Sequence, residues 1–454
     1  MSLRTPRREP ERRGLRLWPV GLALSTAFAT AVLVAATVFF TGWDLLDARG
    51  LKPERRVDSK TLFDLVKLSF GVVAGAGALV ALVVAYRRQR VDEDGALRES
   101  TRLHTERFTA AVSQLGDESA AVRLGGVHAL AGLADDAPTR ALRQTCIDVL
   151  CAYLRLPYTA EADLVAGEVE ARQTYLALRE VRHTVIRLVR DHLRLPVQHQ
   201  HSWQGHDLDF TDVTFDGGDF SRSVFSGGMV RFTGAVFPGG TTSFSGACFS
   251  GGTVDFTGAT FCGGAIAFTG LEFSGGTADF SGSAFSSGRV DFSGSVFSGG
   301  VIAFGGSAFS GGTVDFSGAA FSGGTADFSN TMFSAGRVGF DGATFSRGMV
   351  SFESAECTGG RVGFNGARFS GSTVRFDDAT FSGGRVTFTD TLFSAGVVGF
   401  AGAAFIGAAV RFDNRSLSGG RVDFTNARGT APTGLLPASG PNSPPPGLTV
   451  PPGW

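Results

Sequence analysis

Phenylalanine recurs along the second half of this 454-residue chain at alternating intervals of five and seven residues. The first member of each pair stands at every twelfth position from Phe232 to Phe412, and all 16 of these positions are Phe. The second member begins at Phe237, and 14 of its 16 positions are Phe, the exceptions being Cys357 and Leu417. Chance does not produce this spacing, so we expect a repeat structure in which each unit stacks on the next.

The residues between the phenylalanines predict extended segments with an inward aromatic side. Two positions before each Phe stands a small or β-branched residue, as in Val254-Asp255-Phe256. Residues two apart in an extended chain point the same way, so the small residue and the Phe face inward, and the polar residue between them faces outward. At most repeats Gly stands two positions after the Phe and supplies the positive φ that a corner needs. Two five-residue segments and one inserted pair, often Gly-Thr or Gly-Arg, complete the twelve-residue repeat.

The length of one coil follows from the space that the rings need. A coil of about 12 residues has a perimeter of about 40 Å, which cannot hold Phe side chains from every wall. A coil of about 24 residues gives four walls with one Phe on each, and about nine such coils at ~4.8 Å spacing make a rod about 43 Å long.

The pattern closely resembles the pentapeptide-repeat family, whose units contain a small residue, a polar residue, Leu or Phe, and two more polar or small residues. The opening run keeps strict fives, with Phe210, Phe215, Phe220 and Phe225 at its centres. The whole chain is similar to membrane-anchored bacterial members, in which two spans and a short helical segment precede the repeats. The resemblance covers residues 206–428 and implies an all-β, right-handed quadrilateral β-helix. The inserted pair departs from the family pattern, and it either lengthens two of the four sides or bulges two corners.

Two apolar stretches near the N-terminus predict a transmembrane hairpin. Residues 19–42 are almost wholly apolar, and Trp18 and Trp43 bracket them like an aromatic belt. At about 1.5 Å per residue this stretch crosses a bilayer core of ~30 Å. The second stretch runs from Leu68 to Tyr86 and has basic residues at both ends. A secretory signal is the alternative for the first stretch, but its apolar part is too long and a second span follows directly.

Flanking arginines predict that both termini lie in the cytoplasm of a two-span cell-membrane protein. The expected segments are an Arg-rich cytoplasmic tail at 1–17, transmembrane helices at 18–43 and 65–87, and a short external loop at 44–64. Gly71 and Gly75 form a GxxxG pair in the second span, which marks packing either on another chain or on the chain's own first span. The five cysteines form no CxxC pair, and this favours a reducing compartment.

Residues 88–205 change to a period near 3.6 and predict a helical module. Three apolar stripes recur at this period. The first contains Val122, Gly126, Leu130 and Leu133. The second contains Leu142, Cys146, Val149 and Tyr153, and the third contains Leu178, Val181, Val185 and Leu188. We expect Asp117 as the N-cap of the first helix and Pro138 at the start of the second. The first two helices resemble a single HEAT-like pair. Because a solenoid has an unpaired edge at its end, we expect part of this module to cover the first coil.

The junction with the repeats is rich in histidine, at His199, His201 and His206. Imidazoles can bind a metal, but no acidic or Cys partner recurs at ligand spacing, so a polar linker is the simpler interpretation. At the other end, residues 429–454 are rich in proline, and we expect this tail to stay out of the sheet and to be disordered.

The repeat region lacks the usual signatures of enzymes. The sequence contains no GxSxG, HExxH or P-loop motif, and no lysine follows Lys67. Aspartates that precede Phe can be interpreted as catalytic carboxylates or as outward solvated residues, and we favour the second interpretation. These residues are Asp255, Asp279, Asp291, Asp315 and Asp327. We therefore assign no catalytic, cofactor-binding or metal-binding residues, expect no cofactor, and predict that the chain is not an enzyme.

Three arginines at 24-residue spacing, Arg337, Arg361 and Arg385, are expected to stack on one wall. They form either a partner site or a solvated face.

The sequence favours a membrane-anchored scaffold whose solenoid walls bind an unknown protein partner. The membrane lipid contacts the hairpin, and no small-molecule substrate is expected. The alternative is a DNA-mimicking regulator of a topoisomerase or another DNA-binding protein, but residues 208–427 hold 18 acids against 12 arginines, a sparse charge for a rod that imitates DNA. Binding of nucleic acid itself is not expected. An enzyme hidden in the helical module is a third option, and self-association stays open because the last coil has no obvious cap.

Overall fold

The computed structural model describes residues 58–165, 167–412, 418–436 and 446–454, together with Pro444 and scattered positions between 25 and 44. It divides into two compact units, residues 1–102 and residues 103–454. More than half of the first predicted span at 18–43 and most of the predicted external loop at 44–64 lie outside the described residues, so the two-helix hairpin stays a prediction.

The second predicted span lies within one long helix, α2 (Ser59–Leu115). This helix starts before the predicted span and continues well beyond it. Among the described residues, α2 is the one helix that is long enough and apolar enough to cross a membrane. Its apolar side chains are exposed, with Leu68 at 69%, Phe70 at 71% and Leu82 at 67%.

The helical module contains α3 (Ala120–Asp135), α4 (Arg140–Leu154), the short 3₁₀ helix η2 (Glu161–Asp163) and α5 (Val169–Arg194). The three predicted apolar stripes fall on α3, α4 and α5, which pack together. The predicted N-cap of α3 was wrong: Ser119 is the N-cap, and Asp117 accepts a hydrogen bond from the Ser119 amide at 2.8 Å. The helix α4 begins after Thr139, whose hydroxyl accepts a hydrogen bond from the Leu142 amide.

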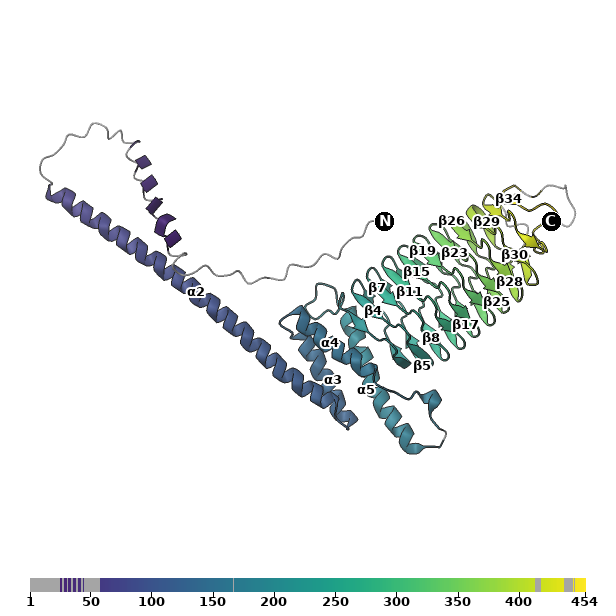
Figure 1. Ribbon diagram of the computed structural model, residues 1–454, viewed down its shortest axis with the longest axis horizontal. Coiled ribbons are helices and arrows are strands. Elements are labelled where there is room, and N and C mark those ends of the chain that lie inside the picture. Colours follow the sequence, from purple (N-terminus) through teal and green to yellow (C-terminus); the bar gives the residue numbers. More distant parts are fainter. Residues whose placement is uncertain are drawn as a thin grey trace. The chain divides into compact units, whose positions relative to one another are not determined.

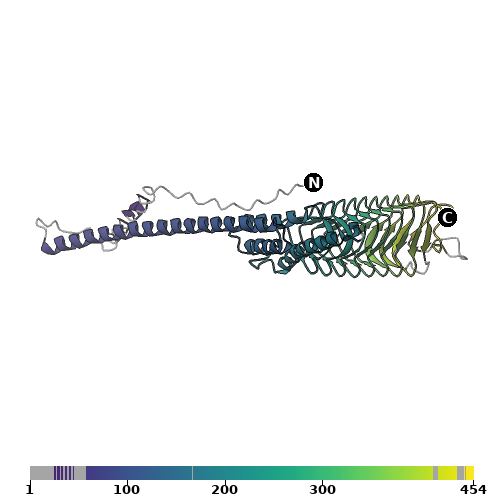
Figure 2. The same ribbon diagram turned by 90° about the horizontal axis from the view of Figure 1, so that it is seen from below.

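The repeats form a parallel β-solenoid of about 10 turns with ~24 residues per coil. Figure 1 shows its strands stacked one coil after another, with α3, α4 and α5 at the end where the solenoid begins. Most full coils contribute two strands to each of two 17-stranded sheets. The regular alternation of short strands and corners along the solenoid is visible in Figure 2.

Sheet A consists of β1 (Leu208–Asp209), β3 (Val224–Phe225), β4 (Met229–Arg231), β6 (Cys248–Phe249), β7 (Thr253–Asp255), β10 (Glu272–Phe273), β11 (Thr277–Asp279), β14 (Val296–Phe297), β15 (Val301–Ala303), β18 (Ala320–Phe321), β19 (Thr325–Asp327), β22 (Thr344–Phe345), β23 (Met349–Ser351), β26 (Arg368–Arg375), β29 (Leu392–Gly399), β32 (Arg421–Asp423) and β34 (Leu448–Thr449). Sheet B consists of β2 (Thr214–Asp219), β5 (Val236–Ser243), β8 (Thr260–Phe261), β9 (Ala265–Ala267), β12 (Ala284–Phe285), β13 (Arg289–Asp291), β16 (Ala308–Phe309), β17 (Thr313–Asp315), β20 (Met332–Phe333), β21 (Arg337–Gly339), β24 (Glu356–Cys357), β25 (Arg361–Gly363), β27 (Thr380–Phe381), β28 (Arg385–Phe388), β30 (Ala404–Phe405), β31 (Ala409–Phe412) and β33 (Arg428–Gly429).

The register confirms the 24-residue coil. Thr277 of β11 pairs in parallel with Thr253 of β7 on one side and with Val301 of β15 on the other. Residues 24 apart are therefore neighbours on adjacent coils, and a 12-residue coil is ruled out. The handedness of the coil stays a prediction.

Phenylalanine fills the inside of the solenoid, as predicted. Residues 24 apart stack face to face, so the rings of Phe256 and Phe280 lie 4.5 Å apart at an angle of 2°. Rings 12 apart come from opposite sides and meet edge to face, and Phe256 and Phe268 lie 6.0 Å apart at 87°. The quadrupole of the aromatic ring favours the edge-to-face contacts, and the parallel pairs follow from the spacing of about 4.8 Å between neighbouring strands. The rings of the repeat are buried throughout the described coils.

Two kinds of corner alternate along each coil. The corner after Phe256 is a type II turn, in which the Ala259 amide donates to the Phe256 carbonyl and Gly258 has φ +67°. A Cβ added to Gly258 would meet nothing within 4 Å. Non-glycine residues with positive φ occur in the described chain only at this corner position. They are Asp212, Arg222, Asn330, Ser354, Asp378, Asp390 and Asn426.

The inserted pair forms the second corner, between the two strands that each coil gives to one sheet. Gly264 has φ +65°, and a Cβ there would approach the Gly240 carbonyl oxygen of the preceding coil to 2.3 Å. A Cβ on Gly263 would come within 2.0 Å of the Pro238 carbonyl oxygen. Of the two predicted effects of the insertion, the structure shows bulged corners, at which the backbones of successive coils come into contact.

The prediction that the Pro-rich tail stays out of the sheet was wrong for β34. The Val422 and Phe424 amides of β32 donate to the carbonyls of Gly447 and Thr449. Proline removes donors from a segment but leaves its carbonyl acceptors, so a Pro-rich segment can still accept these hydrogen bonds. The Trp454 ring then packs over the last rings of the solenoid, 5.4 Å from the Phe424 ring.

Candidate interaction walls

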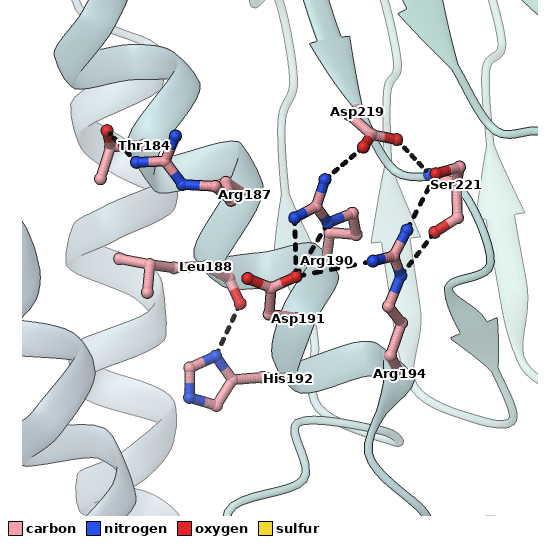
Figure 3. Close-up of polar contacts among 9 residues, drawn as sticks. All are labelled: Thr184, Arg187, Leu188, Arg190, Asp191, His192, Arg194, Asp219 and Ser221. Atoms are coloured by element: carbon pink, nitrogen blue, oxygen red, sulfur yellow. Dashed lines mark hydrogen bonds and ion pairs between the residues drawn. The ribbon is translucent and has the colours of Figure 1, made fainter.

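The first coil is fixed to α5 by charged hydrogen bonds (Figure 3). Arg190 bridges Asp191 of its own helix and Asp219 at the end of β2. Arg194 donates to the Ser221 carbonyl at 2.8 Å and to the Ser221 hydroxyl at 2.9 Å. Burial raises the pKa of Asp219, but hydrogen bonds from Ser221 and Arg190 outweigh burial and hold the pKa below its usual value.

A second set of contacts at the same edge is more deeply buried. The Tyr175 hydroxyl donates to the Asp216 carboxylate at 2.5 Å, and the Glu161 amide donates to the same carboxylate at 3.0 Å. Arg182 reaches the carbonyls of Leu154 and Thr214, both at 2.7 Å. These contacts supply hydrogen-bond partners to polar groups of the first coil. An uncovered strand edge at this place would pair with an added strand.

The aspartates that precede Phe have a structural role in the corners. In each of the five predicted cases, the Oδ1 atom accepts a hydrogen bond from the backbone amide two residues later, at 2.8 to 2.9 Å. Burial raises the pKa of Asp255, but hydrogen bonds from Thr257 outweigh it, so the pKa lies below its usual value. These are Asx turns, which hold the type II corner. Sequence reasoning missed this role, although the recurring Asp-Phe-Ser/Thr-Gly order was visible.

Sheet B carries the predicted arginine ladder on its outer face. Arg337 pairs in register with Arg361, and Arg361 with Arg385, so the three lie on successive coils. Arg337 forms an ion pair with Asp341 at 2.6 Å. In the part of the chain that the structure describes, Arg361 and Arg385 are exposed and make no ion pair. The ladder is therefore a positive stripe whose charge is partly uncompensated.

Sheet A presents a different wall. Its outward column at the start of the longer strands holds threonine, valine and methionine, and Val301, Met349 and Val397 are 38%, 39% and 40% exposed. The threonines of this column are Thr253, Thr277, Thr325 and Thr373. This column of sheet A is mostly uncharged, in contrast with the arginine stripe of sheet B.

Residues 210–260 match the pentapeptide repeats family (9 copies). The match covers the strict-five opening run and the first two twelve-residue units, which start at Phe232 and Phe244. No curated protein and no solved structure matches the chain. The geometry of the matched part continues through the later coils, which keep the same four columns of inward residues and the same two corners.

Burial makes the thiols of Cys146, Cys151 and Cys357 poorly reactive. All five cysteines are free. Burial raises the pKa of Cys146 to about 11 and that of Cys151 and Cys357 to about 12. A thiol with so high a pKa stays protonated near neutral pH and is a poor nucleophile.

The three junction histidines do not converge. His206 is buried and hydrogen-bonds Gln144 through Nδ1 at 3.0 Å, and burial lowers its pKa to about 4. The rings of His199 and His201 lie 5.3 Å apart near Asp135, with His201 Nδ1 at 3.8 Å from the carboxylate. Among the described residues, no group of three His, Cys, Asp or Glu side chains is placed to hold a metal ion.

Proposed function

We propose that this chain is a membrane-anchored, non-enzymatic scaffold whose pentapeptide-repeat solenoid presents its walls to a protein partner. One observation carries the proposal: the inside of the solenoid is filled with rings, so the outer walls are the surface that it offers. On each wall the same outward positions recur once per coil. Such a regular array of side chains is suited to extended contacts with a protein.

The anchor in this proposal is α2, together with the preceding apolar stretch as a second span. The exposed apolar side chains of α2 between Leu68 and Leu82 need a nonpolar environment, and a bilayer provides one. Both termini are then cytoplasmic, and the reduced cysteines of the repeats are compatible with that compartment.

Alkaline extraction of membranes tests the anchor. The full chain is expected to stay in the membrane pellet at high pH, whereas a chain lacking residues 1–102 is expected in the supernatant. Release of the full chain under these conditions would contradict the membrane-anchor part of the proposal.

Proximity labelling with paired wall variants tests the scaffold. The sheet B variant carries Arg361→Glu and Arg385→Glu, and the sheet A variant carries Thr277→Glu and Val301→Glu, each pair being in register on adjacent coils. All four positions face outward, so both variants are expected to fold. The proposal predicts that one wall variant loses a reproducible set of labelled proteins that the other keeps. Identical sets for wild type and both variants would contradict a wall-based scaffold.

A further inference from the structure

The last coils of sheet B contain a cavity of ≈ 490 Å³. Three segments that are apart in sequence line it: the outer face of β28, the stretch from β30 to β31, and residues 430–433. The last segment is held beside β31 by hydrogen bonds, since the Phe412 amide donates to the Thr433 carbonyl at 2.8 Å and the Thr433 amide donates to the Val410 carbonyl at 2.9 Å. The cavity is therefore built by the fold and lies within the size range of ligand sites.

Two arginines give this cavity its charge. Arg385 is the last arginine of the ladder, and Arg411 lies on the next coil beside Thr387. Neither makes an ion pair with any residue that the structure describes, and both are exposed. By contrast, Arg289, which stands in the same outward column but is separated from the ladder by Thr313, pairs with the carboxylates of Asp291 and Asp315.

Hydroxyl groups add further donors, and the rest of the lining is mostly apolar, with Ile406 and Pro432 among its residues. Thr387, Thr389 and Thr430 face the cavity beside the two arginines. No carboxylate lines the cavity among the described residues. A cavity with guanidinium and hydroxyl donors and no acceptor carboxylate matches a ligand that only accepts hydrogen bonds and carries negative charge.

We propose that this cavity binds a phosphate-bearing anion with more than one phosphoryl group. The planar guanidinium donates two parallel hydrogen bonds to a phosphoryl group, so each of the two arginines can hold one such group. Arg361 lies one coil earlier, in register with Arg385 at a strand spacing of about 4.8 Å, and extends the positive surface beyond the cavity. The proposal concerns a small ligand and does not depend on the scaffold function.

Titration calorimetry of the full chain in detergent with inorganic pyrophosphate tests the proposal. Wild type is expected to bind, and Arg385→Gln and Arg411→Gln are each expected to weaken the affinity about tenfold or more, because each removes charge-assisted hydrogen bonds. Arg289→Gln is the control, since it removes one exposed arginine of the same outward column outside the cavity, and it is expected to leave the affinity unchanged within about twofold.

Two results would overturn the proposal: no binding of pyrophosphate by wild type at millimolar concentration, or an equal loss of affinity in Arg289→Gln, which would indicate diffuse attraction only. Nanodiscs with and without cardiolipin, whose headgroup carries two phosphoryl groups, distinguish the two sources of the phosphate. Weaker pyrophosphate binding in the acidic discs, dependent on Arg385 and Arg411, supports a lipid headgroup in the cavity, and equal binding in both discs supports a soluble ligand.

Discussion

A methyl group on Gly264 would lie 2.3 Å from the carbonyl oxygen of Gly240, one coil earlier. No such contact exists at Gly258, where the added carbon would meet nothing within 4 Å, although both glycines have positive φ. The two corners of the repeat therefore require glycine for different reasons. At the type II corner the requirement is conformational, and at the inserted pair it is also steric.

Gly264→Ala is therefore expected to be much more destabilising than a substitution at the other corner. The clash must be relieved by moving one coil against the next, and we expect a loss of about 2 kcal/mol or more in the free energy of unfolding. Gly258→Asn is the control, because Asn occupies this corner position at Asn330 and Asn426, and its cost should be about 1 kcal/mol or less. Urea unfolding followed by circular dichroism measures both. Equal midpoints for the two variants would contradict the close approach of the coils.

Cys357 interrupts the column of rings between Phe333 and Phe381, and a small cavity of ≈ 10 Å³ lies beside it. Phe at this position is expected to restore the stack and to raise the free energy of unfolding by about 1 kcal/mol. The converse change, Phe333→Cys, is expected to lower it by about 2 to 4 kcal/mol, since it removes a buried ring and enlarges the gap beside Cys357. Thermal melts of both variants test the pair. A lower melting temperature for Cys357→Phe would show that the neighbouring rings have closed over the gap.

His206 predicts a specific loss of stability in acid. Burial lowers the pKa of His206 to about 4, below its ordinary value of 6.5, so the unfolded chain binds this proton more readily than the folded chain. The contribution of neutral His206 is fully present above pH 6.5 and is lost as the pH falls toward 4, by up to about 3 kcal/mol. His206→Asn keeps a donor for Gln144 and should remove this part of the pH dependence between 6.5 and 4. Parallel stability curves for variant and wild type would rule out the effect.

The repeat core was predictable because its signal is periodic. Inward rings at Phe256 and its equivalents, the 24-residue coil and positive φ at Gly258 all follow from spacing that recurs more than ten times in the chain. The choice between lengthened sides and bulged corners was not available from spacing, because it depends on the contact between Gly264 and the preceding coil. That contact joins residues of neighbouring coils, and a recurring Gly alone does not distinguish it from the positive φ of an ordinary corner.

The errors concern features that occur once. The packing of Trp454 on Phe424 and the addition of β34 to sheet A depend on where the chain returns, and a single Trp in a Pro-rich stretch carries no signal for that. The N-cap of α3 was misplaced because Asp117 and Ser119 are both good caps, and the local hydrogen bond between them decides which one starts the helix. The Asx turns recur and could have been recognised from Asp followed two residues later by Ser or Thr.

Unfolding of a Phe304→Ala variant is the most direct test of the central claim, that columns of inward rings hold the solenoid together. Phe304 is fully buried and stacks on Phe280 and Phe328, both at 4.8 Å. Removing the ring is expected to lower the free energy of unfolding by about 3 to 5 kcal/mol. The outward substitution Val301→Ala on the same coil is the control and should cost less than about 1 kcal/mol. Melting of Phe304→Ala at or above the wild-type temperature would contradict the account.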